Sequence, residues 1–130
     1  MGRIIYAEDD DIVGEIATSA LFGAGHAVGW LRDGQAALEA MRFRTPDVAV
    51  LDLHMPNMDG MRVVRAMRVD PHLAMVPVLM LTAVSGRSDK DIAFYEGVDD
   101  YLTKPFDPDE LIFRVEQLMG GNIRRTGMFA

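Results

Sequence analysis

The sequence contains no cysteine, which excludes both disulfide bridges and a thiol nucleophile. Positive charge is also scarce, because 13 Lys and Arg stand against 20 Asp and Glu and give a formal net charge of −7 at pH 7. This balance argues against a general affinity for nucleic-acid phosphates, although it leaves a basic partner open. The 130 residues suit one domain with a sizeable core, and they contain neither an internal repeat nor a low-complexity segment.

Long hydrophobic runs are missing as well. The most apolar stretch, residues 75–81, is interrupted by Pro77 and is far too short to span a membrane. No signal peptide is visible, because the largely apolar residues 3–7 run directly into acidic ones. The pair Met1-Gly2 lacks the Ser or Thr that a myristoylation motif requires. We therefore expect a soluble cytoplasmic protein with no membrane partner.

Apolar segments of four or five residues alternate with amphipathic helical patterns. The central one is Val48–Leu51, an unbroken apolar run of the kind that forms a strand buried on both faces of a sheet. The predicted strands are Arg3–Ala7, Ala27–Leu31, Val48–Leu51, 77–81 and Asp100–Thr103. The predicted helices begin near Asp10 or Asp11, Asp33, Asp59, Ser88 and Asp107, and they end near Gly25, Thr45, Asp70, Gly97 and Gly120. This alternation favours an α/β fold with a parallel sheet and helices on both faces.

Polar residues stand where four of the predicted strands end: Glu8 and Asp9, Asp52, Thr82, and Lys104. Taken singly, each has an ordinary explanation as a helix cap, a turn residue or a surface lysine. Parallel strands bring these ends to one edge of the sheet, and the ordinary explanations do not predict that all four positions meet there. Crowded carboxylates need a cation, and oxygen ligands favour Mg²⁺, with Mn²⁺ as an alternative. Carboxylates, an ammonium and a hydroxyl suit phosphoryl transfer, in which an aspartate can be the nucleophile.

The motifs at these positions are Glu8-Asp9-Asp10, Asp52 through Gly60, Leu81-Thr82-Ala83 and Asp99 through Phe106. Together they resemble the receiver domain of bacterial two-component response regulators, in the single-domain form of the chemotaxis regulators. The resemblance covers roughly residues 3–119. It implies a flavodoxin-like, doubly wound five-stranded parallel sheet of order 2-1-3-4-5 with five helices. We expect a receiver domain over residues 1–119 and a C-terminal tail or linker stub over residues 120–130.

The resemblance also implies a role for each acidic residue at the edge of the sheet. Asp52 is expected to be the phosphoacceptor and to take its phosphoryl group from a histidine kinase or a phosphotransfer protein. Asp9 is expected to bind Mg²⁺ directly and Glu8 largely through water. The backbone carbonyl of His54 is expected to be a further metal ligand.

The remaining motif residues are expected to bind the phosphoryl group and to transmit its arrival. The resemblance assigns Thr82 and Lys104 to the phosphoryl oxygens, and it makes Tyr101 the aromatic side chain whose position follows that of Thr82. Phosphorylation is expected to let Tyr101 turn inward. The bond between Lys104 and Pro105 is expected to be cis, which prolyl bonds tolerate at low cost. His26 and His72 have the look of ordinary loop residues.

The resemblance also implies that a downstream protein target binds the face formed by the fourth helix, the fifth strand and the last helix. In the predicted helix 88–96, Ile92 and Phe94 are about 200° apart around the axis, whereas Ile92 and Tyr95 are about 60° apart. One packed face cannot bury all three, so this short helix must expose at least one large apolar side chain. Exposed apolar groups of this kind often mark a partner surface.

The leading hypothesis is therefore a signalling switch that catalyses only its own phosphorylation and dephosphorylation. One alternative is a Mg²⁺-dependent phosphatase or hydrolase with an aspartate nucleophile, but such enzymes usually have an acid two residues later, where this chain has His54. A flavin site at the same edge is disfavoured, because acid after the first strand repels a phosphate. A receiver-like scaffold that takes no phosphate is disfavoured by the complete set of site residues. No output domain follows Met119, so we expect either a protein that acts alone or a piece of a longer chain.

Overall fold

The computed structural model describes residues 1–120, and within them strands and helices alternate as predicted. The strands are β1 (Arg3–Ala7), β2 (Ala27–Leu31), β3 (Val48–Leu51), β4 (Val78–Thr82) and β5 (Asp100–Thr103). The helices are α1 (Asp11–Gly23), α2 (Gly34–Phe43), α3 (Gly60–Val69), α4 (Arg87–Glu96) and α5 (Pro108–Gly120). The bounds differ from the prediction by one or two residues at a few places: β4 lies one residue later, α4 begins one residue earlier, and α1 and α2 end about two residues earlier. Apart from Gly120, the segment expected to be a tail or linker lies outside the described residues.

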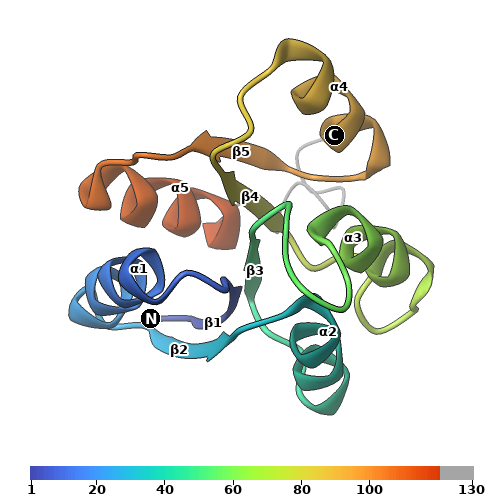
Figure 1. Cartoon of the computed structure of the whole chain (residues 1–130). Coiled ribbons are helices and arrows are strands. Elements are labelled where there is room, and N and C mark those ends of the chain that lie inside the picture. The colour runs from blue at the N-terminus through green and yellow to red at the C-terminus, as the bar shows by residue number, and fades with distance from the viewer. Residues whose placement is uncertain (121–130) are drawn as a thin grey trace.

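The five strands form one parallel sheet in the order β2-β1-β3-β4-β5, which confirms the predicted flavodoxin-like topology. Figure 1 shows α1 and α5 on one face of the sheet and α2, α3 and α4 on the other. Strand β2 lies on one side of β1, and β3, which follows β2 in the chain, lies on the other side. The direction in which strands are added to the sheet therefore reverses between β1 and β3. Ligands of such sheets bind at the carboxyl ends of the strands near this reversal. Among residues 1–120, no helix combines the length and apolarity needed to cross a bilayer.

Strand β3 lies at the centre of the sheet and is buried along its whole length. Because side chains alternate across a strand, Val48 and Val50 join the core beneath α1 and α5, whereas Ala49 and Leu51 join the core beneath α2 and α3. This two-sided burial is what the unbroken apolar run predicted. The strand therefore carries no polar side chain, and the first one is Asp52, which directly follows the strand and is itself buried.

Aspartates fix the starts of the helices nearest the carboxyl edge of the sheet. The Asp10 carboxylate accepts hydrogen bonds from the backbone N–H groups of Ile12 and Val13, which identifies Asp10 and not Asp11 as the cap of α1. Asp33 and Asp59 cap α2 and α3 in the same way. Helix α4 differs, because its cap is Gly86 and no side chain bonds to its first turn. The loop before α4 is therefore held by other contacts, which prove important for the site.

The prediction that His26 is an ordinary loop residue was wrong. The ring is buried between β2, the start of β1 and α5. Its Nδ1 accepts a hydrogen bond of 3.0 Å from the backbone N–H of Gly2, and its Nε2 lies 2.8 Å from Oε2 of Glu116. These partners are 24 and 90 residues away, so local sequence carried no sign of them. His26 joins the amino ends of the strands to α5, opposite the edge where the acidic residues gather.

Candidate functional site

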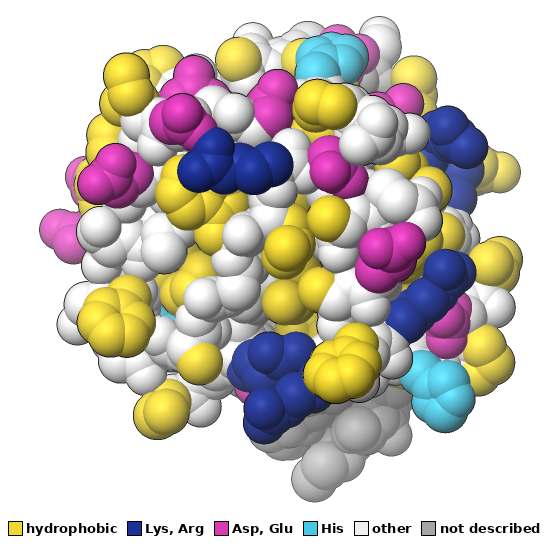
Figure 2. Space-filling view, turned by 60° about the horizontal axis from the view of Figure 1, so that its bottom comes forward, with side chains coloured by type: hydrophobic (Ala, Val, Ile, Leu, Met, Phe, Trp, Pro, Cys, Tyr) yellow, Lys and Arg dark blue, Asp and Glu magenta, His cyan; other side chains and the backbone are white. Residues whose placement is uncertain are grey.

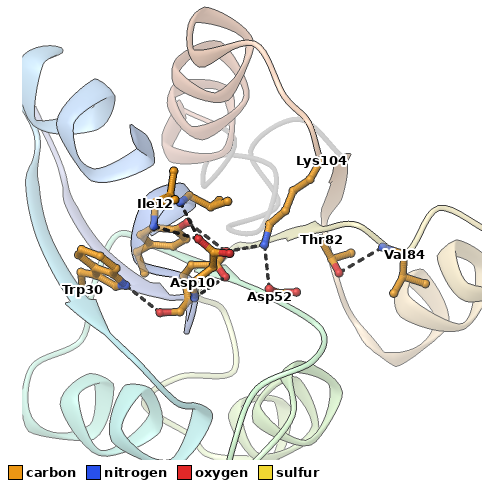
Figure 3. A network of polar contacts seen from close by, with 10 residues as sticks. Asp10, Ile12, Trp30, Asp52, Thr82, Val84 and Lys104 are labelled. Atoms are coloured by element: carbon orange, nitrogen blue, oxygen red, sulfur yellow. Dashed lines mark hydrogen bonds and ion pairs between the residues drawn. The ribbon is translucent and has the colours of Figure 1, made fainter. Parts of the chain in front are cut away.

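The polar residues predicted to converge do meet at the carboxyl edge of the sheet. Glu8 follows β1, Asp52 follows β3, Thr82 ends β4 and Lys104 follows β5. Figure 3 shows Lys104 extended from β5 toward Asp52, with Thr82 on the neighbouring strand. The bond between Lys104 and Pro105 is cis, as the resemblance implied.

The Lys104 ammonium is shared between two carboxylates. Its Nζ lies 2.6 Å from Oε1 of Glu8 and 2.8 Å from Oδ2 of Asp52, and its side chain is only 14% exposed. Burial acts to lower the pKa of Lys104, but the hydrogen bonds to Asp52 and Glu8 outweigh it and the pKa is raised. Lys104 therefore stays charged, in a position to neutralise whatever anion binds beside Asp52.

Glu8 is the most deeply placed acid of the site and is fully buried. Its carboxylate accepts hydrogen bonds from the Tyr6 hydroxyl at 3.3 Å and from the backbone N–H of Asp10 at 3.2 Å. Burial raises the pKa of Glu8, and the nearby charge of Asp52 raises it further, while the bond to Lys104 acts in the opposite direction. The pKa of Tyr6 is also raised, first by burial and then by the charge of Glu8. Burial and the neighbouring Asp52 thus both disfavour the charged form of Glu8.

This carboxylate cluster has the chemistry of a site for a hard cation. Each of Glu8, Asp9 and Asp52 offers one oxygen, and these atoms lie within 4.8 Å of one another. Asp9 is exposed, whereas the other two are buried, so one side of the cluster faces solvent. Mg²⁺ prefers oxygen ligands and keeps several waters, which an open acidic cluster of this kind allows. The residues therefore fit Mg²⁺ or Mn²⁺, and the ligand role of the His54 carbonyl stays a prediction.

Thr82 and Tyr101 both bond to Val84, in the loop between β4 and α4. The Val84 N–H donates to Oγ1 of Thr82 at 3.4 Å, and the Tyr101 hydroxyl donates to the Val84 carbonyl at 2.6 Å. Tyr101 is only 7% exposed, and burial raises the pKa of its hydroxyl. The expectation that Tyr101 begins outside and turns inward on phosphorylation therefore needs correction, because here the side chain is already inside. Its ring lies 6.4 Å from that of Phe94 on α4.

Helix α4 exposes three large apolar side chains, whereas helical geometry required only one. Ile92, Phe94 and Tyr95 are 53%, 46% and 89% exposed, and Ala93 is the buried residue of this helix. The prediction that at least one large apolar side chain faces solvent is confirmed. Of these three side chains, Phe94 is the one whose ring packs against that of Tyr101.

Sequence reasoning missed two residues that touch Glu8, namely Tyr6, whose hydroxyl donates to the Glu8 carboxylate, and Trp30. The indole N–H of Trp30, on β2, donates a hydrogen bond of 2.9 Å to the backbone carbonyl of Glu8. The only available signal was an aromatic N–H near the end of a strand that neighbours β1. That signal gives no partner, because the contact spans 22 residues and depends on the register of β2 against β1.

Comparison with known proteins agrees with the fold. Residues 4–116 match the family model described as the response regulator receiver domain. The chain is 39% identical over 120 residues to the DNA-binding response regulator MtrA of Mycolicibacterium smegmatis, covering 92% of this chain and 51% of that protein. The chain thus spans about half the length of the curated relatives it matches.

Solved structures resemble this one closely. A putative response regulator from Chloroflexus aurantiacus is 35% identical with a TM-score of 0.87, covering 92% of this chain and 98% of that chain. The receiver domain of the sensor histidine kinase PA1611 from Pseudomonas aeruginosa is 27% identical with a TM-score of 0.85, covering 92% of this chain and 98% of that chain. That structure has a magnesium ion coordinated in its active-site cleft.

Proposed function

The chain belongs to the response regulator receiver family, whose members are signalling switches, and we propose that Asp52 is its phosphoacceptor. The observation that carries this proposal is the 2.8 Å contact between Lys104 Nζ and Asp52 Oδ2, in the midst of the carboxylate cluster. Lys104 neutralises negative charge beside Asp52, and the exposed Asp9 leaves one side of the cluster open to solvent, from which a phosphoryl donor would approach. We propose residues 1–119 as the receiver domain and residues 120–130 as a tail or linker.

The proposed reaction moves one phosphoryl group from a phosphohistidine of a histidine kinase or phosphotransfer protein. An oxygen of Asp52 attacks the phosphorus, an O–P bond forms, and the N–P bond breaks with its electron pair going to the imidazole nitrogen. Lys104 keeps its charge beside the new phosphoryl oxygens, and the Thr82 hydroxyl donates a hydrogen bond to them. Self-catalysed phosphorylation and dephosphorylation are the only chemistry proposed.

We propose Mg²⁺ as the cofactor, with Mn²⁺ as an alternative. Glu8, Asp9, Asp52 and the His54 carbonyl would hold the ion, with Glu8 acting largely through water. When bound, the ion would supply positive charge that offsets the charge of the incoming phosphoryl group. The support from this chain is the carboxylate cluster, and the support from a relative is the magnesium ion of the Pseudomonas aeruginosa receiver domain.

The proposed switch runs from Thr82 through Val84 to Tyr101. When the Thr82 hydroxyl turns toward a phosphoryl oxygen, Oγ1 moves away from the Val84 N–H, and the loop that also holds the Tyr101 hydroxyl loses one of its two contacts. The phosphoryl group shifts this equilibrium only by its different contacts in the two arrangements. Because Tyr101 lies beside Phe94, the loop movement changes the exposed surface of α4.

The proposed downstream partner is a protein that binds α4, β5 and α5. The formal net charge of −7 disfavours binding to nucleic-acid phosphates, and the one face seen in Figure 2 intersperses acidic, basic and hydrophobic side chains without a continuous basic patch. We therefore propose no direct nucleic-acid contact for residues 1–120. MtrA is named as DNA-binding, but this chain spans about half of it. The proposed place of action is the cytoplasm, where ATP-dependent kinases phosphorylate their partners.

The test is intact-mass measurement after incubation with Mg²⁺ and a small phosphodonor. We expect one phosphoryl group on the wild type, more stable in acid than in base, and none on Asp52→Asn. Glu39→Gln, an exposed acid on α2, is the matched control and is expected to be labelled fully. Equal labelling of Asp52→Asn and wild type would contradict the assignment. Steady release of phosphate from added monoesters would favour the hydrolase alternative instead.

A further inference from the structure

Trp30 is the one tryptophan of the chain, and it binds the backbone of a proposed metal ligand. Its Nε1–H donates to the Glu8 carbonyl at 2.9 Å, and the Leu31 carbonyl accepts from the Glu8 N–H at 3.0 Å. Both backbone polar groups of Glu8 are therefore bound to the last two residues of β2. Figure 3 shows the indole reaching the acidic loop from the side opposite Lys104.

The indole is held in place from several directions. A Cβ at position 14 of α1 would lie 1.9 Å from the ring, so the ring passes α1 only because residue 14 is glycine. The guanidinium of Arg32 lies 4.2 Å from the ring centroid and also forms an ion pair with Asp11 at the start of α1. The Tyr6 ring is stacked at 6.4 Å. The indole N–H thus has a fixed direction, which a hydrogen bond to one carbonyl requires.

Holding the Glu8 carbonyl constrains two metal ligands at once. The peptide between Glu8 and Asp9 is planar, so its carbonyl oxygen and the Cα atoms of both residues share one plane. Both ligand side chains start from that plane. Rotation of the carbonyl would therefore turn the Asp9 and Glu8 carboxylates relative to Asp52. Without a fixed carbonyl, the loop would lose conformational entropy when the cation binds, and this loss would weaken the affinity for the cation.

We propose that Trp30 is a positioning residue for the metal site, acting through the Glu8 carbonyl, and this inference rests on the proposed function. The critical variant is Trp30→Phe, which keeps an aromatic ring beside Gly14 but removes the N–H. Mn²⁺ affinity is measured from the electron paramagnetic resonance signal of the free ion, well below the unfolding temperature. The variant is expected to bind Mn²⁺ about tenfold more weakly than wild type, the range of lost supporting contacts at metal sites.

The control is Val76→Ala, a buried position before β4 at the far end of the sheet. It lowers stability without touching the acidic loop, so its Mn²⁺ affinity should equal that of wild type. If Trp30→Phe unfolds as easily as Val76→Ala yet binds Mn²⁺ like wild type, Trp30 only packs and the proposal is overturned. If the wild type itself binds no Mn²⁺, the metal site fails and the proposed function fails with it.

A measurement on the wild type keeps the proposal testable even if Trp30→Phe does not fold. The chain has a single indole, so its N–H gives one assignable signal in a proton–nitrogen NMR spectrum. Mg²⁺ should move this signal, with a midpoint equal to that of the Asp9 amide. An indole signal that stays fixed while the Asp9 amide moves would show that the Glu8 carbonyl and the metal ligands are not coupled.

Discussion

The hydroxyl of Tyr101 lies 2.6 Å from the carbonyl oxygen of Val84 and so joins β5 to the loop before α4. The contact from the Val84 N–H to Thr82 Oγ1 is much longer, at 3.4 Å. Hydrogen bonds weaken with distance, so the loop is held more firmly by Tyr101 than by Thr82. A movement of Thr82 toward a phosphoryl group therefore breaks the weaker of the two contacts first.

Replacing Tyr101 with Phe should loosen this loop while leaving the ring in place. Amides of residues 83–86 should exchange hydrogen faster in Tyr101→Phe than in wild type, because the loop has lost its stronger contact. Beryllofluoride with Mg²⁺, a phosphoryl mimic, should still bind, but the amide shifts that it causes on α4 should be smaller than in wild type.

The matched control for that variant is Tyr95→Phe, since Tyr95 is on α4 and is 89% exposed. This control should exchange and respond like wild type. If beryllofluoride shifts the α4 amides of Tyr101→Phe as much as those of wild type, the bond from Tyr101 to Val84 is not needed to transmit phosphorylation to α4.

Lys104 is expected to be essential for stability when no metal is present. In Lys104→Met, Glu8 and Asp52 are left buried without their shared cation. Removing one partner of a buried ion pair costs about 3–5 kcal/mol, so the free energy of unfolding in EDTA should fall by roughly that amount. Mg²⁺ should restore part of the loss, because it binds the same carboxylates.

The control for this prediction is the other lysine of the chain, Lys90. Lys90 is half-buried and its Nζ lies 5.6 Å from the centroid of the Tyr101 ring, away from the carboxylates, so Lys90→Met should change the unfolding free energy in EDTA by less than about 1 kcal/mol. Urea denaturation followed by circular dichroism measures both variants. Equal stabilities of Lys104→Met and Lys90→Met would show that the carboxylates do not depend on Lys104.

Much of this arrangement was predictable from the sequence because the relevant signals are local. The run Val48–Leu51 identifies a doubly buried strand, and Asp52 stands at its end, so parallel strands alone place it with Glu8 and Lys104. The topology followed from the family resemblance and is confirmed. Local capping preferences likewise identified the helix starts at Asp33 and Asp59.

Contacts that depend on register or side-chain direction were not predictable. Lys104 contacts both Glu8 and Asp52, and this depends on three-dimensional distances that the positions of the residues in the sequence do not give. The bond from Trp30 to the Glu8 carbonyl needs both the pairing of β1 with β2 and the missing Cβ at Gly14. The bond from the Tyr101 hydroxyl to the Val84 carbonyl depends on the path of a loop, which composition does not specify.

Asp9 should contribute to metal binding and not to the stability of the metal-free protein. It is exposed, and its charge adds to that of Glu8 and Asp52, so Asp9→Asn removes repulsion together with a proposed ligand. Mg²⁺ affinity, measured by calorimetry, should fall sharply. The unfolding free energy in EDTA should be unchanged or slightly higher.

Its neighbour Asp10 serves as the control, because replacing Asp10 should lower stability and leave metal binding nearly unchanged. Asp10 caps α1, so Asp10→Ala should lower the unfolding free energy by about 1 kcal/mol while Mg²⁺ affinity changes little. A large stability loss for Asp9→Asn in EDTA would show instead that Asp9 supports the fold.

His26 is expected to stabilise the end of the molecule opposite the acidic site. Its Nδ1 accepts the Gly2 N–H, so the ring proton must be on Nε2, where it is donated to Glu116. In His26→Ala both bonds are lost and the Gly2 N–H has no acceptor in a buried place. The unfolding free energy should fall by about 2–4 kcal/mol from the lost bonds and the cavity.

Because His26 is far from Asp52, its effect on stability can be measured separately from phosphoryl uptake. It precedes β2, at the amino ends of the strands, whereas Asp52 is at their carboxyl ends. Hydrogen exchange should therefore quicken for residues 2–7 in His26→Ala, while phosphoryl uptake at saturating phosphodonor should match wild type. His72→Ala, an exposed histidine, should change neither quantity. A loss of phosphoryl uptake in folded His26→Ala would mean that the two ends of the sheet are coupled, contrary to the separation that the structure shows.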